Sequence, residues 1–410
     1  MPKSILPLLF FVQRSSMERR DLTKSQAMRG FVFGSLIFFA VFASTAVPIP
    51  LYSTFQSQIG LTNADVSYTM LWYLCGVVLT LLLASRLSDA FGRRRVTFLT
   101  VALAIVGCLL FLQARDSFMV FAARFVQGVS AGLTMSAVSA LVVDCISRYN
   151  LSLGSAMASC GSMVGIMMGS IGVGVLFGAT HSTQAAFGVM AVILAVSACG
   201  LVFVPDPLAV RASKRSVLKV SVFIPHHAKR AFFIANCLYL ATWVTGSFFQ
   251  AFSSPLAVAE LHSSSTLLAA LVLSAAMAPS MIGGPLTARL TRKHALWVGI
   301  ALLCASSIGM ACTLAAHATA AFLGACALFS VSMGITNSTS LRMLLVAVEP
   351  SQTSAIIGSV NLFAYLGCSV FSFLFGPMVG AWGYTGSLWL LAAVNGVLSV
   401  AVLAVARPLK

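Results

Sequence analysis

Charged residues are scarce in this chain. They make up 8% of its 410 residues, whereas 59% are hydrophobic, and only nine residues are acidic. A soluble protein of this length needs far more charge to cover its surface. The composition therefore excludes a soluble globular protein and favours one that is embedded in a membrane.

Motifs that carry catalytic or metal chemistry are also missing. The ten cysteines form no CxxC pair and lie mostly in apolar stretches, so we expect neither a disulfide framework nor a metal site. No GK[ST] phosphate loop and no cluster of nucleophile, base and orienting acid occurs, which argues against an enzyme or a cofactor. The formal charge of +16 is dispersed between apolar stretches without a basic face, so nucleic acid is not an expected partner.

Long apolar stretches dominate the chain instead. Each is long enough to cross a hydrocarbon core of roughly 30 Å, and only helices or closed barrels satisfy the backbone there. Short segments of alternating hydrophobicity, typical of a barrel, are absent. The sequence predicts an all-α polytopic membrane protein whose lipid-embedded helices lie at 30–52, 66–86, 96–114, 117–143, 153–179, 186–204, 231–257, 266–287, 295–315, 319–348, 353–380 and 385–406.

Basic residues mark one side of this arrangement. If twelve helices alternate in direction, the basic residues of the tails and of alternate loops fall on one side, and the opposite loops carry only Arg115. Basic loops stay in the cytoplasm, so we expect both termini there and the protein in the inner (plasma) membrane. The apolar run at 5–12 is too short for a secretory signal and precedes several arginines, so we interpret it as part of a cytoplasmic tail.

The two halves of the chain are similar to each other. The stretch at 141–165 resembles that at 344–367, which aligns Asp144 with Glu349 at about half the chain length. Chance similarity between hydrophobic segments is the alternative. Two parallel six-helix halves around a central site are typical of secondary transporters. The predicted parts are a tail at 1–29, a bundle at 30–204, a linker at 205–230, a bundle at 231–406 and a tail at 407–410.

The segment SRLSDAFGRRRV (85–96), directly after the second predicted helix, resembles the signature loop G-x-L-x-D-x-x-G-R-R of the major facilitator superfamily. The matched positions are Leu87, Asp89, Gly92, Arg93 and Arg94. Ser85 replaces the first glycine of the motif. The resemblance covers nearly the whole chain and implies the fold of that superfamily, with two pseudo-symmetric six-helix bundles that transport by alternating access.

The resemblance also implies roles for the loop. Asp89 lies by the start of the eleventh helix, whose N-terminus carries partial positive charge. Gly92 permits a tight turn, and Arg93 or Arg94 reaches Asp144 at the cytoplasmic end of the fourth helix. These residues are expected to form a switch that closes the inner side and breaks when the protein opens inward. The alternative is that the arginines only set the topology.

A second resemblance lies in the fourth helix. RFVQGVSAG (124–132) resembles the R-x-x-Q-G motif common among proton-coupled members. A buried arginine costs several kcal/mol, so Arg124 is expected to face the bundle interior or a watery cavity, unless it snorkels outward. Six glycines between 154 and 174 resemble the signature of drug:proton antiporters, but Ile166 replaces its proline. Close helix packing is the alternative for these glycines.

No acidic residue is expected in the middle of a predicted helix. The first helix, where many multidrug antiporters carry an acid, has none, and all nine acids fall in loops or at helix ends. A proton carrier usually needs a titratable group that both sides reach in turn. Proton coupling through Asp65, through Asp89 or through the substrate itself is therefore left open.

Polar and aromatic residues in the predicted helices are candidates for a substrate pathway. They are Trp72, Tyr73, Arg124, Gln127, Asn236, Tyr239, Trp243, Gln250, Asn337 and Asn361. Two intramembrane arginines, Arg124 and Arg342, and no core acid favour neutral or anionic cargo. The leading hypothesis is a monomeric secondary transporter that exports a small organic molecule, such as a drug or metabolite. The alternative is an uptake permease or facilitator for a small neutral or anionic metabolite.

Overall fold

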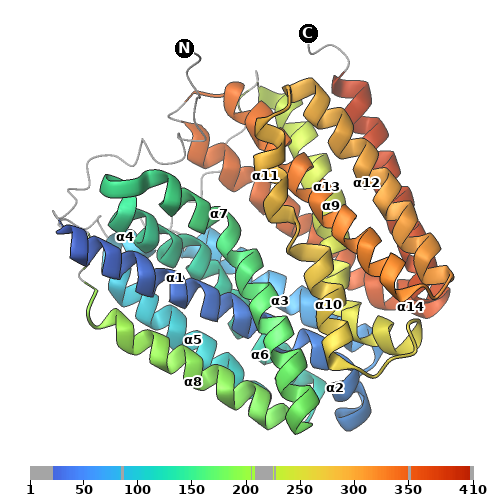
Figure 1. Cartoon of the computed structure of the whole chain (residues 1–410), viewed down its shortest axis with the longest axis horizontal. Helices are drawn as coiled ribbons and strands as arrows, with labels where there is room; N and C mark the ends of the chain where they lie inside the picture. The colour runs from blue at the N-terminus through green and yellow to red at the C-terminus, as the bar shows by residue number, and fades with distance from the viewer. Residues whose placement is uncertain are drawn as a thin grey trace.

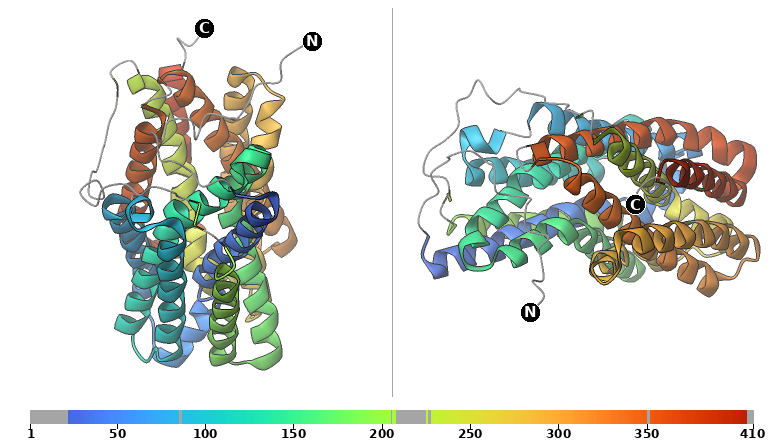
Figure 2. Two further views of the ribbon diagram at one scale, coloured as in Figure 1. Left: turned by 90° about the vertical axis from the view of Figure 1, so that its left-hand side faces the viewer. Right: turned by 90° about the horizontal axis from the view of Figure 1, so that it is seen from above.

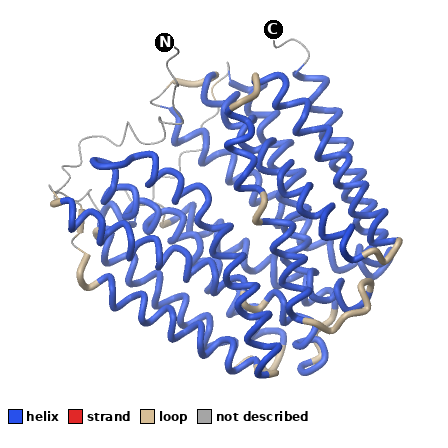
Figure 3. The backbone as a smooth tube through the Cα atoms, viewed as in Figure 1, coloured by secondary structure: helices blue, strands red, loops and turns tan. Residues whose placement is uncertain are grey.

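The computed structural model describes residues 22–84, 87–204, 206–207, 225, 228–349 and 352–406, and it contains no β-strand among them. In chain order the elements are α1 (Lys24–Ala46), η1 (Ile49–Leu51), α2 (Tyr52–Ile59), α3 (Asn63–Leu83), α4 (Leu87–Phe91), α5 (Arg93–Leu112), α6 (Ser117–Leu133), η2 (Thr134–Val138), α7 (Ser139–Thr180), α8 (Thr183–Leu201), α9 (Lys229–Ala259), α10 (Thr266–Met277), α11 (Ser280–Ala288), α12 (Arg292–Ala315), α13 (Thr319–Val346) and α14 (Thr353–Ala406). Short loops join most of them (Figure 3).

Eleven helical stretches of the described chain are long and apolar enough to cross a membrane. The last of them, Ile356–Ala406, contains two crossings because Gly383 has φ 66° and turns the chain. A second break at Asn150, where φ is −157°, divides α7 between the fourth and fifth crossings. The predicted twelve transmembrane helices are thus confirmed.

The helix ends differ from the predicted ones by several residues. The first helix begins at Lys24, where Thr23 and Gln26 form a reciprocal capping box, and the fourth continues to Asn150. Hydropathy marks only the part of a helix that lies in lipid. Hydropathy does not detect the polar turns by which a helix continues beyond the lipid into water.

The helices form two bundles, α1–α8 and α9–α14 (Figure 1). The bundles diverge toward α4 and α11 and converge near α2 and α10, and Figure 2 shows the same arrangement from two further sides. We call the α4/α11 side the open end and the α2/α10 side the closed end.

Two glycine pairs bring helices into backbone contact within each bundle. Gly76 of α3 meets Gly128 of α6, and Gly283 of α11 meets Gly334 of α13, so closely that a Cβ atom on any of the four would overlap the facing backbone. The two pairs lie about half the chain apart, at corresponding helices of the two halves. This matched packing agrees with the internal similarity of the sequence.

The glycines of the fifth crossing also serve close packing. Gly161, Gly165 and Gly169 lie against α1, and Gly174 lies against α10 of the other bundle. A Cβ atom on Gly169 would overlap the backbone of Ala43. Small residues of this kind let membrane helices approach each other, which supports the packing interpretation of this stretch.

Candidate substrate pathway

Arg124 and Gln127 of α6 fasten the fourth crossing to the end of the first. The Nη1 atom of Arg124 donates to the carbonyl oxygen of Thr45 at 2.8 Å and to Oε1 of Gln127 at 2.9 Å. The Nε2 atom of Gln127 donates to the carbonyl oxygen of Ser44 at 2.9 Å. Both side chains are only 1% exposed. They therefore connect two helices inside the first bundle.

The guanidinium group of Arg124 also lies over the ring of Tyr73, 4.7 Å from its centroid. This cation–π contact is favourable because the ring face carries negative potential. The Nε atom of Arg124 is buried and has no hydrogen-bond partner in the described part of the chain. Arg124 thus faces the bundle interior, as expected, and does not snorkel. In this conformation, however, it is closed off and does not line an open path.

Three aromatic side chains of the second bundle follow one another toward the first. The ring centroids of Tyr239 and Trp243 in α9 are 5.2 Å apart, and those of Trp243 and Tyr365 in α14 are 4.9 Å apart. The Tyr365 hydroxyl then donates to the sulfur of Met135 at 3.3 Å. We call Tyr239, Trp243 and Tyr365 the aromatic row. The row lies in the second bundle and reaches the first at Met135, near the middle of three crossings, the fourth, the seventh and the eleventh.

Met135 lies in η2, a π-helical turn within the fourth crossing. Such turns are rare and occur often at functional sites, because the extra residue re-aims the side chains of the turn. The contact with Tyr365 makes η2 the part of the first bundle that meets the aromatic row. No signal in the sequence had identified Met135.

The remaining pathway candidates lie in different surroundings. Thr242 donates to Oδ1 of Asn337 at 3.2 Å, which joins α9 to α13 beside the aromatic row. Asn236 donates to the carbonyl oxygen of Phe232, one turn earlier in its own helix, at 2.9 Å. Gln250 and Asn361 are half-buried. Trp72 is 43% exposed and packs edge-to-face on Phe125. Its side chain therefore lies at the surface of the bundle, whereas the adjacent Tyr73 is buried inside it.

The second intramembrane arginine has a main-chain partner. Nη1 of Arg342 in α13 donates to the carbonyl oxygen of Thr287 at 2.7 Å, near the C-terminal end of α11. Carbonyl groups at a helix end lack partners within the helix, and they carry partial negative charge. Arg342 therefore ties the tenth crossing to the eighth.

The signature loop forms a buried ion cluster in the first bundle. Gly92 has φ 97°, a left-handed conformation that favours glycine, and it is the N-cap residue directly before α5. Arg93 is 1% exposed; it pairs with Asp89, and its Nε atom donates to Oδ2 of Asp144 at 3.1 Å. Arg94 instead lies over the ring of Phe98, 5.8 Å from its centroid. Arg93 is thus the arginine that reaches Asp144.

This cluster is intact although the bundles diverge at the same end. All three of its members, Asp89, Arg93 and Asp144, belong to the first bundle. Separating two bundles does not by itself stretch a contact within one of them. The role of these residues as a switch that breaks on inward opening stays a prediction. The side chains at 353–355, where the predicted eleventh helix begins and near which Asp89 was expected, lie outside the described ones, as do Ser85 and Arg86 of the motif.

Direct hydrogen bonds join the two bundles at the closed end. Ser254 of α9 bonds to Ser53 of α2, with 2.7 Å between the hydroxyl oxygens, and donates to the carbonyl oxygen of Pro50 at 2.9 Å. The Ser67 hydroxyl of α3 donates to the carbonyl of Ser372 and accepts from the N–H of Gly376 at 3.0 Å.

Two further hydroxyl contacts complete this set. The hydroxyl of Tyr384 donates to Oδ1 of Asn63 at 3.2 Å, and the hydroxyls of Ser170 and Ser274 are 3.0 Å apart. Each of these pairs connects α3 or α7 to a helix of the second bundle. Together with the contacts of Ser254 and Ser67, they hold the closed end together.

Two carboxylates outside the ion cluster have structural partners. Asp65 accepts from the N–H of Thr62 at 2.9 Å and from its hydroxyl at 2.7 Å, which completes a capping box at the start of α3. Asp116 accepts from the N–H of Met119 at 2.8 Å and caps α6. Within the described residues, no group of three or more His, Cys, Asp or Glu is placed to hold a metal ion.

Fold and contacts together define a multi-pass helical membrane protein whose two bundles meet around a central aromatic row. The family model of the Major Facilitator Superfamily matches residues 34–372, and the chain belongs to this superfamily.

Individual relatives match over shorter stretches. Two uncharacterized MFS-type transporters of Mycobacterium tuberculosis are each 29% identical over 138 residues, which cover 32% of this chain and 20% of each relative. The multidrug resistance protein MdtL of Shewanella sp. (strain ANA-3) is 31% identical over 90 residues, 22% of this chain and 23% of that protein. The chain thus matches about a fifth of the length of these relatives.

A solved structure extends the likeness to the whole fold. A mutant of the nucleoside transporter NupG superposes with a TM-score of 0.72 and covers 93% of this chain and 99% of its own. Its sequence is 11% identical, so this similarity concerns the fold alone.

Proposed function

We propose that this protein exports small amphiphilic organic molecules by alternating access, with the aromatic row as the substrate platform. The row is the observation that carries the proposal, since it lies near the middle of the crossings and contacts the first bundle at Met135. The similarity to a multidrug resistance protein over part of the chain supports export.

The chemistry of the row suits uncharged cargo with a flat or apolar body. Aromatic faces and the thioether of Met135 offer dispersion and stacking contacts, while the Thr242–Asn337 pair supplies a few polar atoms for orientation. Every described acidic residue lies at a helix end or beyond it, so no carboxylate lies beside the row to attract a cation.

The direction in which the protein faces follows from its basic loops. With the predicted orientation, the open end is cytoplasmic and the structure is inward-facing. The bundles at 30–204 and 231–406 would then rock as two bodies joined by the linker at 205–230, and both termini would be cytoplasmic. The ion cluster at Arg93 would keep the inner ends of the first bundle rigid during this motion.

Coupling of export to proton exchange is supported by fewer observations than the substrate platform. Asp65 caps a helix, and Asp89 and Asp144 share Arg93, so protonation of any of them would weaken a structural contact. An antiport mechanism would use one of these groups or a proton carried by the substrate itself. Flux that does not change with an external pH step or an uncoupler in proteoliposomes would exclude proton coupling without affecting the proposed site.

The test of the site is binding to purified protein. Diverse metabolites and antibiotics are screened by thermal shift, and any hit is titrated against Trp243→Ala and Tyr365→Phe. Both variants should bind at least several-fold more weakly, since they remove a stacking face or the hydroxyl that contacts Met135. Trp382→Ala, at a tryptophan that is 59% exposed, is the control and should bind normally. Unchanged affinity in both row variants would exclude the platform.

Uptake is the second candidate, favoured by the absence of a described carboxylate in the middle of a crossing. Such a chain would act as a facilitator for a small neutral or anionic metabolite. Cells that lack the gene distinguish the two functions. Hypersensitivity to toxic compounds supports export, and lost growth on a nutrient supports uptake.

A further inference from the structure

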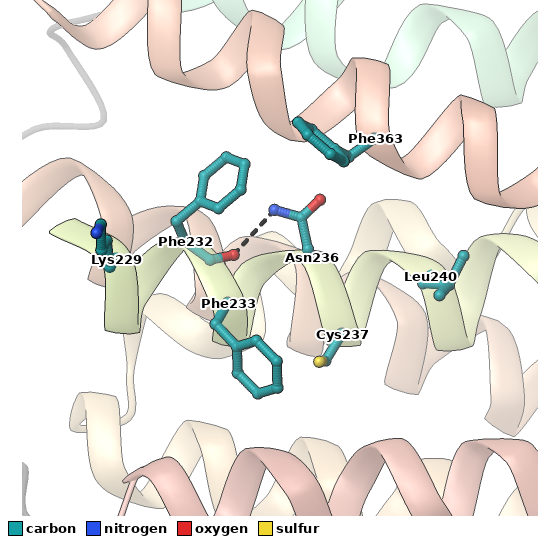
Figure 4. Close-up of a pocket in the computed structure, with 7 residues that line it drawn as sticks. All are labelled: Lys229, Phe232, Phe233, Asn236, Cys237, Leu240 and Phe363. Atoms are coloured by element: carbon teal, nitrogen blue, oxygen red, sulfur yellow. Dashed lines mark hydrogen bonds between the residues drawn. The ribbon is translucent and has the colours of Figure 1, made fainter. Parts of the chain in front are cut away.

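A crevice of about 450 Å³ lies on the second bundle, between α9 and α14 (Figure 4). Its lining residues are Lys229, Phe232, Phe233, Asn236, Cys237, Leu240 and Phe363. Six of these seven recur every three or four positions along α9 and therefore share one face of that helix. The seventh, Phe363, projects toward this face from the neighbouring helix (Figure 4).

The crevice is open toward the outside of the bundle. Phe233 is 43% exposed and Phe363 is 47% exposed. On the opposite face of α9, Ile234 and Leu238 are buried to 0% and 1% exposure against the bundle core. Of the crevice residues, Cys237 is itself buried in this core cluster at 7% exposure, whereas Phe233 and Phe363 are exposed on the side of the bundle that faces the hydrocarbon of the membrane.

Nearly all of the lining is apolar. Within the span, Asn236 is the one polar side chain, and its amide nitrogen is already engaged by the carbonyl oxygen of Phe232. A water-soluble ligand would gain little from such walls and would have to enter through lipid. An acyl chain of the surrounding bilayer fits both the chemistry and the access.

A positive charge stands at one end of the crevice. Lys229 is the first residue of α9, Arg230 follows it, and both are exposed. They lie at the open end, where a membrane-spanning helix reaches the headgroup layer. Basic groups in this layer attract anionic lipids, and pockets between helices that combine such groups with apolar walls bind their headgroups.

We propose that this crevice binds one anionic phospholipid of the adjacent leaflet, with an acyl chain between Phe233 and Phe363 and the phosphate at Lys229. The ammonium group of Lys229 supplies three donors for the phosphate oxygens. The site lies apart from the aromatic row and does not depend on the direction or substrate of transport.

The test is native mass spectrometry of the delipidated full-length protein titrated with phosphatidylglycerol. The wild type should retain one lipid with an affinity about fivefold higher than Lys229→Gln, as expected for the loss of one basic contact. Lys293→Gln, at another exposed basic residue near the start of α12, is the matched control and should resemble the wild type. Equal retention by Lys229→Gln and the wild type would overturn the proposal.

Two further lipids separate the parts of the site. Phosphatidylcholine, which has no net charge, should bind the wild type and Lys229→Gln equally and weakly; binding as tight as that of phosphatidylglycerol would exclude a charge-selective site. Dihexanoyl phosphatidylglycerol should bind more weakly than the long-chain lipid because it leaves most of the crevice empty. Equal affinity would show a headgroup contact alone and overturn the acyl-chain assignment. Both readouts are independent of transport, so they stand whether or not the proposed export function holds.

Discussion

Gln127 gives the carbonyl oxygen of Ser44 the hydrogen bond that Pro48 cannot. In a regular helix this carbonyl would accept from the N–H four residues later, and proline has none. The break that ends the first crossing therefore leaves an acceptor buried in the first bundle, and a side chain of the fourth crossing satisfies it. Arg124 supports the arrangement by bonding both to Gln127 and to the adjacent carbonyl of Thr45.

Removing this bond should destabilise the protein. Gln127→Leu leaves the Ser44 carbonyl and one donor of Arg124 without partners, at a cost of about 1–3 kcal/mol for each buried unsatisfied group. We expect a lowered midpoint of thermal unfolding in detergent. Gln184→Ala, at an exposed glutamine in the first turn of α8, is the control and should unfold like the wild type. A Gln127→Leu midpoint equal to that of the wild type would contradict this account of the helix end.

The ion cluster should behave as a coupled unit. Arg93→Ala removes the cation that the two buried carboxylates of Asp89 and Asp144 share, and breaking a buried pair costs about 3–5 kcal/mol. Asp144→Ala should also destabilise, and the double variant should lose less than the sum of the two, which an unfolding-based double-mutant cycle measures. Arg94→Ala, whose guanidinium contacts only the Phe98 ring among the contacts described above, should cost much less. Additive losses would show that Arg93 and Asp144 act separately.

The glycine pairs should tolerate no side chain. Gly128→Ala and Gly334→Ala each place a Cβ atom against the backbone of Tyr73 or Ser280, so we expect loss of folded protein from the membrane. Gly309→Ala is the matched control, because its Cβ atom would lie at an ordinary 3.7 Å from the nearest atom. The measurement is the monodisperse yield after detergent extraction. Normal yield of both pair variants would mean that the helices can move apart without penalty.

The closed end should loosen when its hydroxyls are removed. Ser67→Ala deletes one donor and one acceptor between α3 and α14, and each such bond contributes about 1 kcal/mol. The population open at this end should rise by roughly fivefold or more, seen as longer distances between spin labels at Gln184 and Ser264. Ser57→Ala, whose hydroxyl bonds within its own helix, is the control. Identical distance distributions in all three proteins would contradict the role of Ser67.

The sequence predicted the framework of this molecule because the framework depends on length and charge. A stretch of about twenty apolar residues forms a transmembrane helix in lipid, and basic loops predict which of its ends lies in the cytoplasm. The resemblance of the loop predicted a contact between Asp144 and either Arg93 or Arg94, and the structure selects Arg93. Such a contact is physically reasonable because few charges exist and a buried one needs a partner. The turn at Gly92 followed from the conformational freedom of glycine.

The remaining features depend on information that a single sequence does not hold. Trp72 and Tyr73 are neighbours, and only the packing of α3 decides that the tyrosine is buried while the tryptophan is exposed. The π-helical turn at Met135 has no local signature. The serines of the closed end have no sequence feature that distinguishes them from other serines of membrane helices. Their role is seen only from their contacts with the other bundle. Contacts between bundles also change with conformation, so no residue pattern encodes them directly.

The hydrogen bonds described between the bundles at the closed end join hydroxyl, amide and main-chain groups, none of which carries a formal charge. Breaking them moves no charge through the electric field across the membrane, which would otherwise contribute about 2.3 kcal/mol per elementary charge for every 100 mV. Nor does dissolved salt screen neutral dipoles in contact as it screens ions. The step that unlocks this end is therefore expected to proceed equally well in energised and de-energised membranes, so any voltage dependence of turnover must arise elsewhere in the cycle.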